Sequence, residues 1–257
     1  MNLARILAVI RFELRRTATP PRLALWAVLA LFPVAIVTLL VGFSAPIEHR
    51  DTWTGLLLAL IPLIVCPLSL LLWATPIVNS ELEGNTWPYL AVRPHGRTSV
   101  LLGKYVTAIT WTSLAGWTGL TIAFFIIQPE RGFHNWLVLA TLVLLASIAY
   151  GAVFTFLGVL VHRRPIVTAV AYALILEFAA GWVPAVVNQL TVRLRLQSLL
   201  FAWADWSSPP PPEALNIFTT PGPAMQHVVI LLVASVVLMA ASVWLLRQKA
   251  LVAGSDA

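Results

Sequence analysis

Long apolar stretches dominate this sequence and leave it few ways to fold. A helix needs about 20 mostly apolar residues to cross the ~30 Å hydrocarbon core of a bilayer, and six stretches of the chain meet that requirement. Of the 257 residues 60% are hydrophobic and only 10% are charged, whereas soluble domains carry roughly 25% charged residues. We therefore expect an all-α integral membrane protein with six transmembrane helices. The expected spans are residues 23–43, 54–78, 99–127, 136–161, 165–183 and 225–246.

Basic residues collect on one side of these expected spans. Twelve of the 16 lysines and arginines fall in segments that six spans would place on the same side of the membrane. Cytoplasmic segments carry an excess of Lys and Arg, so both termini are expected to be cytoplasmic. The net charge of +6 then reflects topology, and we expect no nucleic-acid partner. The twelve residues are Arg5, Arg11, Arg15, Arg16, Arg22, Arg93, Arg97, Lys104, Arg163, Arg164, Arg247 and Lys249.

The first 21 residues are expected to form an interfacial helix. Apolar residues recur at helical spacing from Leu3 to Leu14, and arginines project from the other side. A helix with these two faces lies in the membrane surface, and Pro20 then breaks it. Two interpretations remain open: the helix only anchors the first span, or it is an elbow helix that also contacts a cytoplasmic partner. The arginines of its polar face are Arg5, Arg11, Arg15 and Arg16.

The long segment 184–224 is expected on the outer side of the membrane, between spans five and six. It contains the proline run 209–212, which must be an extended chain. Residues 191–197 (TVRLRLQ) alternate like a strand, although apolar residues from Val187 to Phe201 are spaced like a helix face. An isolated strand next to lipid would leave its edges unpaired. We therefore expect a short helix that lies on or dips into the outer leaflet.

The sequence holds no pattern typical of an intramembrane enzyme. The patterns HExxH and GxSxG do not occur. The five histidines stand apart from one another and the chain has one cysteine, so we expect no metal site. Residues 96–105 (GRTSVLLGKY) end in Gly-Lys, but six residues separate the two glycines, and Tyr105 stands where a phosphate-binding loop needs Ser or Thr. We expect neither a catalytic residue nor an ATP site in this chain.

Glu177 is the acid that lies well inside an expected span. An ionised carboxylate near the membrane centre costs about 2.5–3.5 kcal/mol on insertion scales, so Glu177 is expected to be protonated or hydrogen-bonded toward the bundle interior. Two roles remain open: a hydrogen bond to a Tyr or Thr of another helix, or a part in the passage of substrate or protons. Three tryptophans also lie deep in the spans and need packing partners or a pathway to line. The possible substrate path thus comprises Glu177, Trp73, Trp111 and Trp117.

The densest cluster of charge lies between spans two and three, in residues 79–105 (NSELEGNTWPYLAVRPHGRTSVLLGKY). Two acids open it, a short apolar piece follows, and basic residues close it. Aromatic residues and arginines are the usual anchors of protein interfaces, so a short helix here is suited to contact another protein. A plain charged connector is the alternative. The residues expected at the interface are Glu81, Glu83, Gly84, Trp87, Tyr89, Arg93, Arg97 and Lys104.

This order of motifs resembles the permease subunits of type-2 ATP-binding-cassette (ABC) exporters. Those subunits often carry Glu-x-Glu-x-Gly-Thr after the second span, followed by a Leu-rich turn, Arg-Pro and Gly-Lys. Here Glu-Leu-Glu-Gly, Arg-Pro and Gly-Lys stand in that order. The match departs from the family where Asn85 separates the Gly from the Thr, and where Pro88 falls inside the expected short helix. The interfacial helix, the six spans and the long outer segment also fit the plan of the family.

The resemblance implies that the charged loop is a coupling helix that seats in a cytoplasmic ABC ATPase. Two copies of that ATPase would carry ATP and Mg, so no cofactor is expected in this chain. Two copies of the chain, or the chain and a paralogue, would form the pathway in a bacterial-type plasma (inner) membrane. The implied function is the permease of an exporter, and the substrate is open. A stand-alone secondary transporter or channel, or a non-transporting scaffold or immunity protein, remains as the alternative.

The whole chain, 1–257, is expected to form a single transmembrane domain. Its parts are an interfacial helix at 1–21, spans one to five within 22–183, the outer segment 184–224, span six at 225–246 and a cytoplasmic tail at 247–257.

Overall fold

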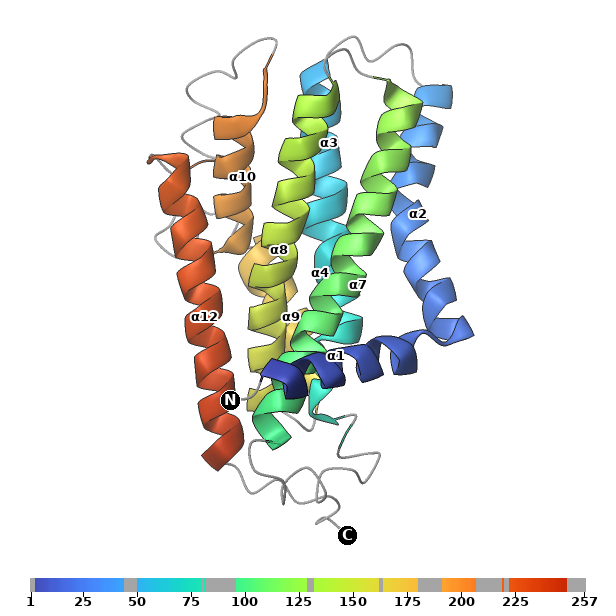
Figure 1. Cartoon of the computed structure of the whole chain (residues 1–257). Helices are drawn as coiled ribbons and strands as arrows, with labels where there is room; N and C mark the ends of the chain where they lie inside the picture. The colour runs from blue at the N-terminus through green and yellow to red at the C-terminus, as the bar shows by residue number, and fades with distance from the viewer. Residues whose placement is uncertain are drawn as a thin grey trace.

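The computed structural model describes a bundle of helices in which most run side by side (Figure 1). Throughout the described residues every regular element is a helix. The structure describes residues 3–43, 50–79, 81, 96–128, 132–161, 164–179, 191–206, 219 and 222–248. The elements are α1 (Leu3–Thr17), α2 (Pro20–Phe43), α3 (Arg50–Leu60), η1 (Ile61–Val65), α4 (Cys66–Trp73), η2 (Thr75–Ile77), α7 (Gly96–Ile127), α8 (Gly132–Leu160), α9 (Pro165–Tyr172), η3 (Ala173–Ala179), α10 (Val192–Trp203) and α12 (Ala224–Gln248).

Five helical stretches are long and apolar enough to cross a membrane. They correspond to the first, second, third, fourth and sixth expected spans, and each lies within a few residues of the expected bounds. The prediction of a multi-pass, all-α membrane protein is therefore confirmed. The five stretches are Pro20–Phe43, Thr52–Ile77, Gly96–Ile127, Gly132–Leu160 and Ala224–Gln248.

The second span is a succession of short pieces because prolines interrupt it. The π-helical turn η1 has Pro62 among its first residues, and α4 has Pro67 in the same position. Pro76 inside η2 departs from helical geometry, with φ −84° and ψ 16°. A proline lacks the N–H that would bond to the preceding turn, so the hydrogen-bond pattern changes at each one. The chain thereby bends away from the helix axis just before Glu81.

The fifth expected span, 165–183, is not one long helix within the described residues. α9 and η3 follow one another and contain eight and seven residues, fewer than the ~20 that a crossing requires. The turn widens to π-helical geometry from Ala173, and Glu177 lies within it. A buried carboxylate needs hydrogen-bond donors, and a regular apolar helix would not bring any to this position. The prediction of six long spans is thus confirmed for five of them.

α9 lies toward the end of the bundle near α1, and α10 lies toward the opposite end (Figure 1). Its first turn meets Glu177, whose carboxylate accepts hydrogen bonds from the backbone N–H groups of Val192 and Arg193. At its other end the carbonyl oxygen of Trp203 lies 2.9 Å from Nε2 of His134, in the first turn of α8. α9 with η3 and α10 are therefore two short helices that meet at Glu177.

The helix expected in the outer segment is confirmed, and the strand alternative for residues 191–197 is wrong. α10 does not lie on the surface, because Leu196, Leu199 and Leu200 are completely or almost completely buried. It packs between α8 and α12. The proline run 209–212 lies outside the described residues.

α8 forms the centre of the bundle and contacts α4, α7, α10 and α12. Lipid tails are as apolar as leucine, so helices in a membrane associate through close packing of small residues. Gly158 shows this directly. A Cβ atom at Gly158 would collide with the carbonyl oxygen of Thr75 in η2. Only glycine lets these two backbones approach so closely.

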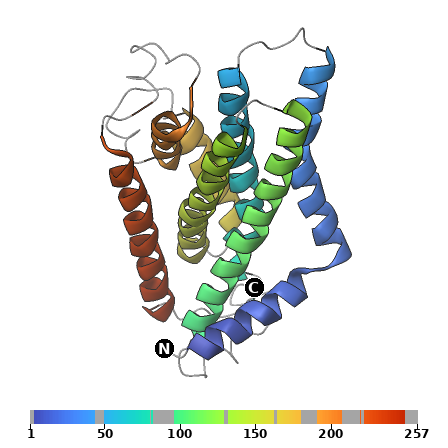
Figure 2. The same cartoon turned by 45° about the horizontal axis from the view of Figure 1, so that its top comes forward.

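α1 lies across the bundle instead of along it (Figures 1 and 2). It contacts α7, and Val9 rests where a side chain at Gly103 would stand. Glu13 and Thr17 are buried on this face, whereas Leu7 is 57% exposed. The face that meets the bundle is therefore beside the apolar stripe, and part of the stripe remains uncovered. We call this end of the bundle, where α2 and α7 begin and α12 ends, the α1 end, and the opposite end the far end.

Candidate functional site

A cluster of buried charges joins three parts of the chain at the α1 end. Glu81, Lys104 and Glu13 are 4%, 8% and 6% exposed. Lys104 donates a hydrogen bond from Nζ to Oε1 of Glu81 and another to the carbonyl oxygen of Ile77 at 3.3 Å. Buried charges are stable only when they are paired and hydrogen-bonded. The Glu81–Lys104 pair therefore fixes the end of the second span against α7.

Arg16 brings α1 into the same cluster. Its NH1 atom lies 3.2 Å from Oε1 of Glu81 and 3.4 Å from Oε1 of Glu13. The Arg16 side chain is 44% exposed, so it closes the cluster toward the surface. These contacts place Glu81, Lys104 and α1 in one unit. The unit stands at both edges of the charged loop, because Glu81 precedes residues 82–95 and Lys104 follows them.

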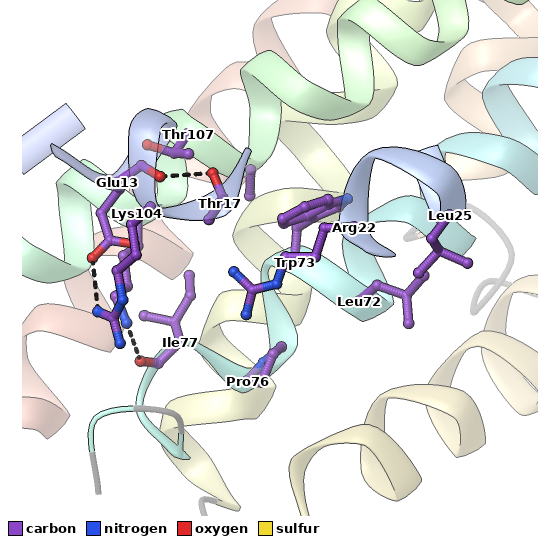
Figure 3. Close-up of a pocket in the computed structure, with 12 residues that line it drawn as sticks. Glu13, Thr17, Arg22, Leu25, Leu72, Trp73, Pro76, Ile77, Lys104 and Thr107 are labelled. Atoms are coloured by element: carbon purple, nitrogen blue, oxygen red, sulfur yellow. Dashed lines mark hydrogen bonds and ion pairs between the residues drawn. The ribbon is translucent and has the colours of Figure 1, made fainter. Parts of the chain in front are cut away.

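A cavity of about 280 Å³ opens beside this cluster (Figure 3). One water molecule needs only ~10–15 Å³ of such space, so the cavity is large enough for a small polar group. Charged residues line one part of it and leucines another, with Trp73 and Arg22 between them (Figure 3). The lining residues are Glu13, Arg16, Thr17, Arg22, Leu25, Leu72, Trp73, Pro76, Ile77, Lys104, Thr107 and Ala108.

Trp73 lines the cavity and belongs to a cluster of three tryptophans. Trp73 stacks on Trp111 with ring centroids 5.9 Å apart, and Trp26 meets Trp111 edge-on at 6.2 Å. Trp26 donates its indole N–H to the carbonyl oxygen of Trp111 at 3.0 Å, and Trp111 donates to Oγ1 of Thr17 at 3.0 Å. The indole nitrogen of Trp73 is buried and has no hydrogen-bond partner among the described residues. Trp73 and Trp111, expected along a substrate path, thus lie together and join α1, α2, α4 and α7.

Glu177 is the centre of a second polar cluster, in the interior of the bundle. Oε2 accepts hydrogen bonds from the Tyr150 hydroxyl at 2.9 Å and the Arg193 N–H at 3.0 Å. Oε1 accepts them from the Tyr172 hydroxyl at 3.0 Å and the Val192 N–H at 3.1 Å. A carboxylate has about four lone-pair positions, and here four donors point at them. The hydrogen bond to a tyrosine, one of the two roles left open by the sequence, is confirmed.

The contact of the Glu177 carboxylate with the first turn of α10 adds to this stabilisation. The first N–H groups of a helix have no partner within the helix, and the helix dipole favours a negative charge there. Thr191 caps the same turn by accepting a hydrogen bond from the N–H of Leu194 at 3.3 Å. The carboxylate of Glu177, which lies in η3, therefore joins α8 and α10 through hydrogen bonds.

The other residues singled out in the sequence lie in separate places. Arg97 donates to the carbonyl oxygen of Leu246 in α12 at 3.4 Å. Trp117 donates to the carbonyl oxygen of Ala140 in α8 at 2.9 Å and does not take part in the tryptophan stack. Arg11 and Arg15 are exposed, and Arg5 lies in α1. The expected interface residues Glu83, Gly84, Trp87, Tyr89 and Arg93 lie outside the described residues.

Several residues of the two clusters were not predicted. Glu13 is the one acid of α1 and lies on the same helical face as Val9 and Thr17. An acid on a largely apolar face is the signal that could have indicated a buried ion pair there. Tyr150 and Tyr172 are tyrosines in spans near the depth of Glu177, which the sequence alone cannot pair. Arg22 was noted only for its charge.

Comparison with known proteins assigns no family to this chain. No protein-family model matches the sequence, and a search of the curated proteins found no match.

Proposed function

We propose that this chain is the membrane-spanning subunit of an ABC exporter and that a separate cytoplasmic ATPase drives it. The order of motifs in residues 79–105 supports the proposal, because an acidic pair, a short apolar piece with aromatics, Arg-Pro and Gly-Lys follow one another as in type-2 permeases. The residues expected to contact the ATPase are Glu83, Trp87, Tyr89 and Arg93.

The Glu81–Lys104–Arg16 cluster is the structural observation that supports the proposal most strongly. Glu81 stands just before residues 82–95 and Lys104 just after them, and both are buried and paired. Arg16 joins α1 to the pair. A partner that moved the loop would act on the second span, α7 and α1 together, because breaking a buried ion pair is costly. This is the mechanical requirement of a coupling element.

The proposed topology has six crossings with both termini in the cytoplasm. Five long helices supply five crossings, and α9, η3 and α10, which meet at Glu177, together supply the other. The basic residues of α1, the start of α7 and the end of α12 lie at the α1 end, which supports its placement on the cytoplasmic side of a bacterial-type inner membrane. α1 then takes the place of an elbow helix.

The proposed assembly contains two permease chains and two ATPase chains. ATP and Mg would bind to the ATPase, and no step of hydrolysis is assigned to this chain. The test is reconstitution of the chain with an ABC ATPase encoded by a neighbouring gene. ATP hydrolysis in proteoliposomes is expected to rise when the permease is present, relative to the ATPase alone. Hydrolysis that is indifferent to the permease would contradict the proposal.

A stand-alone secondary transporter is the second candidate, and Glu177 is the observation that favours it. Secondary transporters place ionisable residues at breaks in helices near the membrane midplane, and Glu177 lies where η3 and α10 meet. Proteoliposomes that contain only this chain distinguish the two. Substrate uptake driven by an ion gradient, and lost in Glu177→Gln, would favour the second candidate, whereas the exporter proposal expects no uptake without the ATPase.

A further inference from the structure

Counted over the described residues, the cavity at the α1 end has one cation more than it has acids. Arg16 and Lys104 pair with the two acids. The guanidinium of Arg22 has neither an ion pair nor a hydrogen bond among the described residues, and lies over the Trp73 ring at 5.7 Å from its centroid. A surplus guanidinium at the edge of a cavity attracts an anion. The charged residues at the cavity are Glu13, Arg16, Arg22, Glu81 and Lys104.

A second donor without an acceptor lies beside Arg22. The indole nitrogen of Trp73 is buried and makes no hydrogen bond with any described residue. Indole N–H is a donor only, and a buried donor without an acceptor is destabilising. The neighbouring tryptophans, Trp26 and Trp111, both donate to oxygen atoms. Among the described residues Trp73 is therefore the exception in its stack, and its ring supports the Arg22 guanidinium at the edge of the cavity.

The cavity continues into an apolar surface. Leu25 of α2 and Leu72 of α4 line it and are 40% and 41% exposed. Figure 3 shows these two leucines side by side next to Arg22 and Trp73, with Glu13 and Lys104 at the other side of the cavity. α2 is among the least buried of the candidate membrane-crossing helices, so the rest of the described bundle leaves this surface uncovered. A ligand that fits has an anionic head and an apolar tail.

We propose that this cavity binds the phosphate of an anionic phospholipid from the leaflet at the α1 end. The phosphate oxygens accept hydrogen bonds from the Arg22 guanidinium, which suits phosphate geometry. The acyl chains lie along Leu25 and Leu72. Basic pockets between transmembrane helices are a known form of lipid headgroup site. A free phosphate ion would use the same donors but would gain nothing from the leucines.

Lipid binding at this place would hold α2 against the end of the second span. Arg22 and Leu25 belong to α2, and Leu72 and Trp73 belong to α4. The tryptophan stack continues the contact to α7 through Trp111. The proposal is independent of the proposed transport function, because it concerns binding alone.

The test measures lipid retention by the full-length protein. The protein is purified in detergent and mixed with equal amounts of phosphatidylglycerol and phosphatidylcholine, and bound lipids are counted by native mass spectrometry. The wild-type protein is expected to retain phosphatidylglycerol preferentially. Arg22→Gln is expected to reduce this preference about tenfold, the effect of losing one charge-assisted hydrogen bond. The matched control is Arg15→Gln, which removes one exposed arginine of the same end and is expected to retain the wild-type preference.

A second variant and a competition with free phosphate complete the test. Arg22→Lys keeps the positive charge and removes the planar guanidinium, so a weaker preference for phosphatidylglycerol is expected. It is also the deciding variant if Arg22→Gln does not fold. Inorganic phosphate at millimolar concentration is expected to leave the lipid bound. An unchanged preference in Arg22→Gln or, where that variant does not fold, in Arg22→Lys would overturn the proposal. An equal loss in Arg15→Gln, or displacement of the lipid by free phosphate, would overturn it as well.

Discussion

The ammonium group of Lys104 lies against the carboxylate of Glu81, and both side chains are almost completely buried. Glu81 precedes residues 82–95, and Lys104 follows them in α7. Arg16 of α1 reaches the same carboxylate at 3.2 Å. The stability of the α1 end therefore depends on charges that have to remain paired.

Removing one member of this pair is expected to be more harmful than removing both. Glu81→Leu leaves the Lys104 ammonium buried without its carboxylate and is expected to cost about 3–5 kcal/mol of unfolding free energy. The double variant Glu81→Leu/Lys104→Met removes both charges and is expected to recover most of that loss. Denaturation in detergent micelles measures both, with Arg15→Gln as an exposed control. Lys104→Met is measured alone as well. If the loss of unfolding free energy in the double variant equals the sum of the losses in Glu81→Leu and Lys104→Met, the two charges are not coupled.

Glu177 is expected to be required for a stable fold. Glu177→Leu leaves two hydroxyl groups and two backbone N–H groups without their acceptor, at about 1–3 kcal/mol for each group that stays buried and unpaired. Tyr172→Phe removes only one hydrogen bond and is expected to cost about 1 kcal/mol. Fluorescence-detected size-exclusion chromatography after heating compares the two. Equal melting of the Leu variant and the wild type would mean that the four hydrogen bonds contribute no stability.

Gly158 and Gly55 offer a matched pair of substitutions. Alanine at Gly158 would push its Cβ into the carbonyl oxygen of Thr75, whereas nothing lies within 4 Å of the same atom at Gly55. Gly158→Ala is therefore expected to destabilise the bundle by about 1–3 kcal/mol, as overpacking does. Gly55→Ala is expected to stabilise it by up to ~1 kcal/mol, because alanine favours the helix. Thermal denaturation of both variants in the same detergent tests the difference. The close approach of η2 and α8 is incorrect if Gly158→Ala melts as high as Gly55→Ala.

The proposed topology is expected to appear in cysteine labelling. Cys66 is buried and is replaced by alanine as a background. Cysteines at Ser44 and Ser208 are expected to react with an impermeant reagent in intact cells. Cysteines at Arg15 and Ser255 are expected to react only after permeabilisation. Labelling of Ser255 from outside would exclude an even number of crossings.

The long membrane-crossing helices could be predicted from the sequence, because the length and apolar composition of a run indicate a crossing. α2, α7, α8 and α12 lie within a few residues of the expected spans. The fifth stretch differed because a local count of apolar residues carries no information about hydrogen-bond donors elsewhere. Glu177 meets Tyr150 and the first turn of α10, and these are contacts between residues far apart in the sequence.

The clusters could be predicted less well than the helices. The sequence places Glu81 and Lys104 at an expected interface but does not show that they form a buried pair with each other. Their sequence separation gives no sign of this, since the pairing depends on how η2 bends and how α1 crosses α7. Trp73 and Trp111 were noted for their depth, and their stacking follows from the same arrangement. Tertiary packing, which periodicity does not encode, decides both.

Binding of an ATPase to the charged loop tests the proposed function most directly. The measurement is co-purification of the cognate ATPase with Trp87→Ala and Glu83→Lys, two positions that are not members of the Glu81–Lys104 pair. The matched control is Phe133→Ala, an exposed aromatic residue at the far end of α8. Loss of an interface anchor typically costs ~2 kcal/mol or more, so both loop variants are expected to retain less than about a tenth of the ATPase, and the control all of it. Wild-type ATPase retention by both loop variants would contradict the assignment of this chain as an ABC permease coupled through that loop.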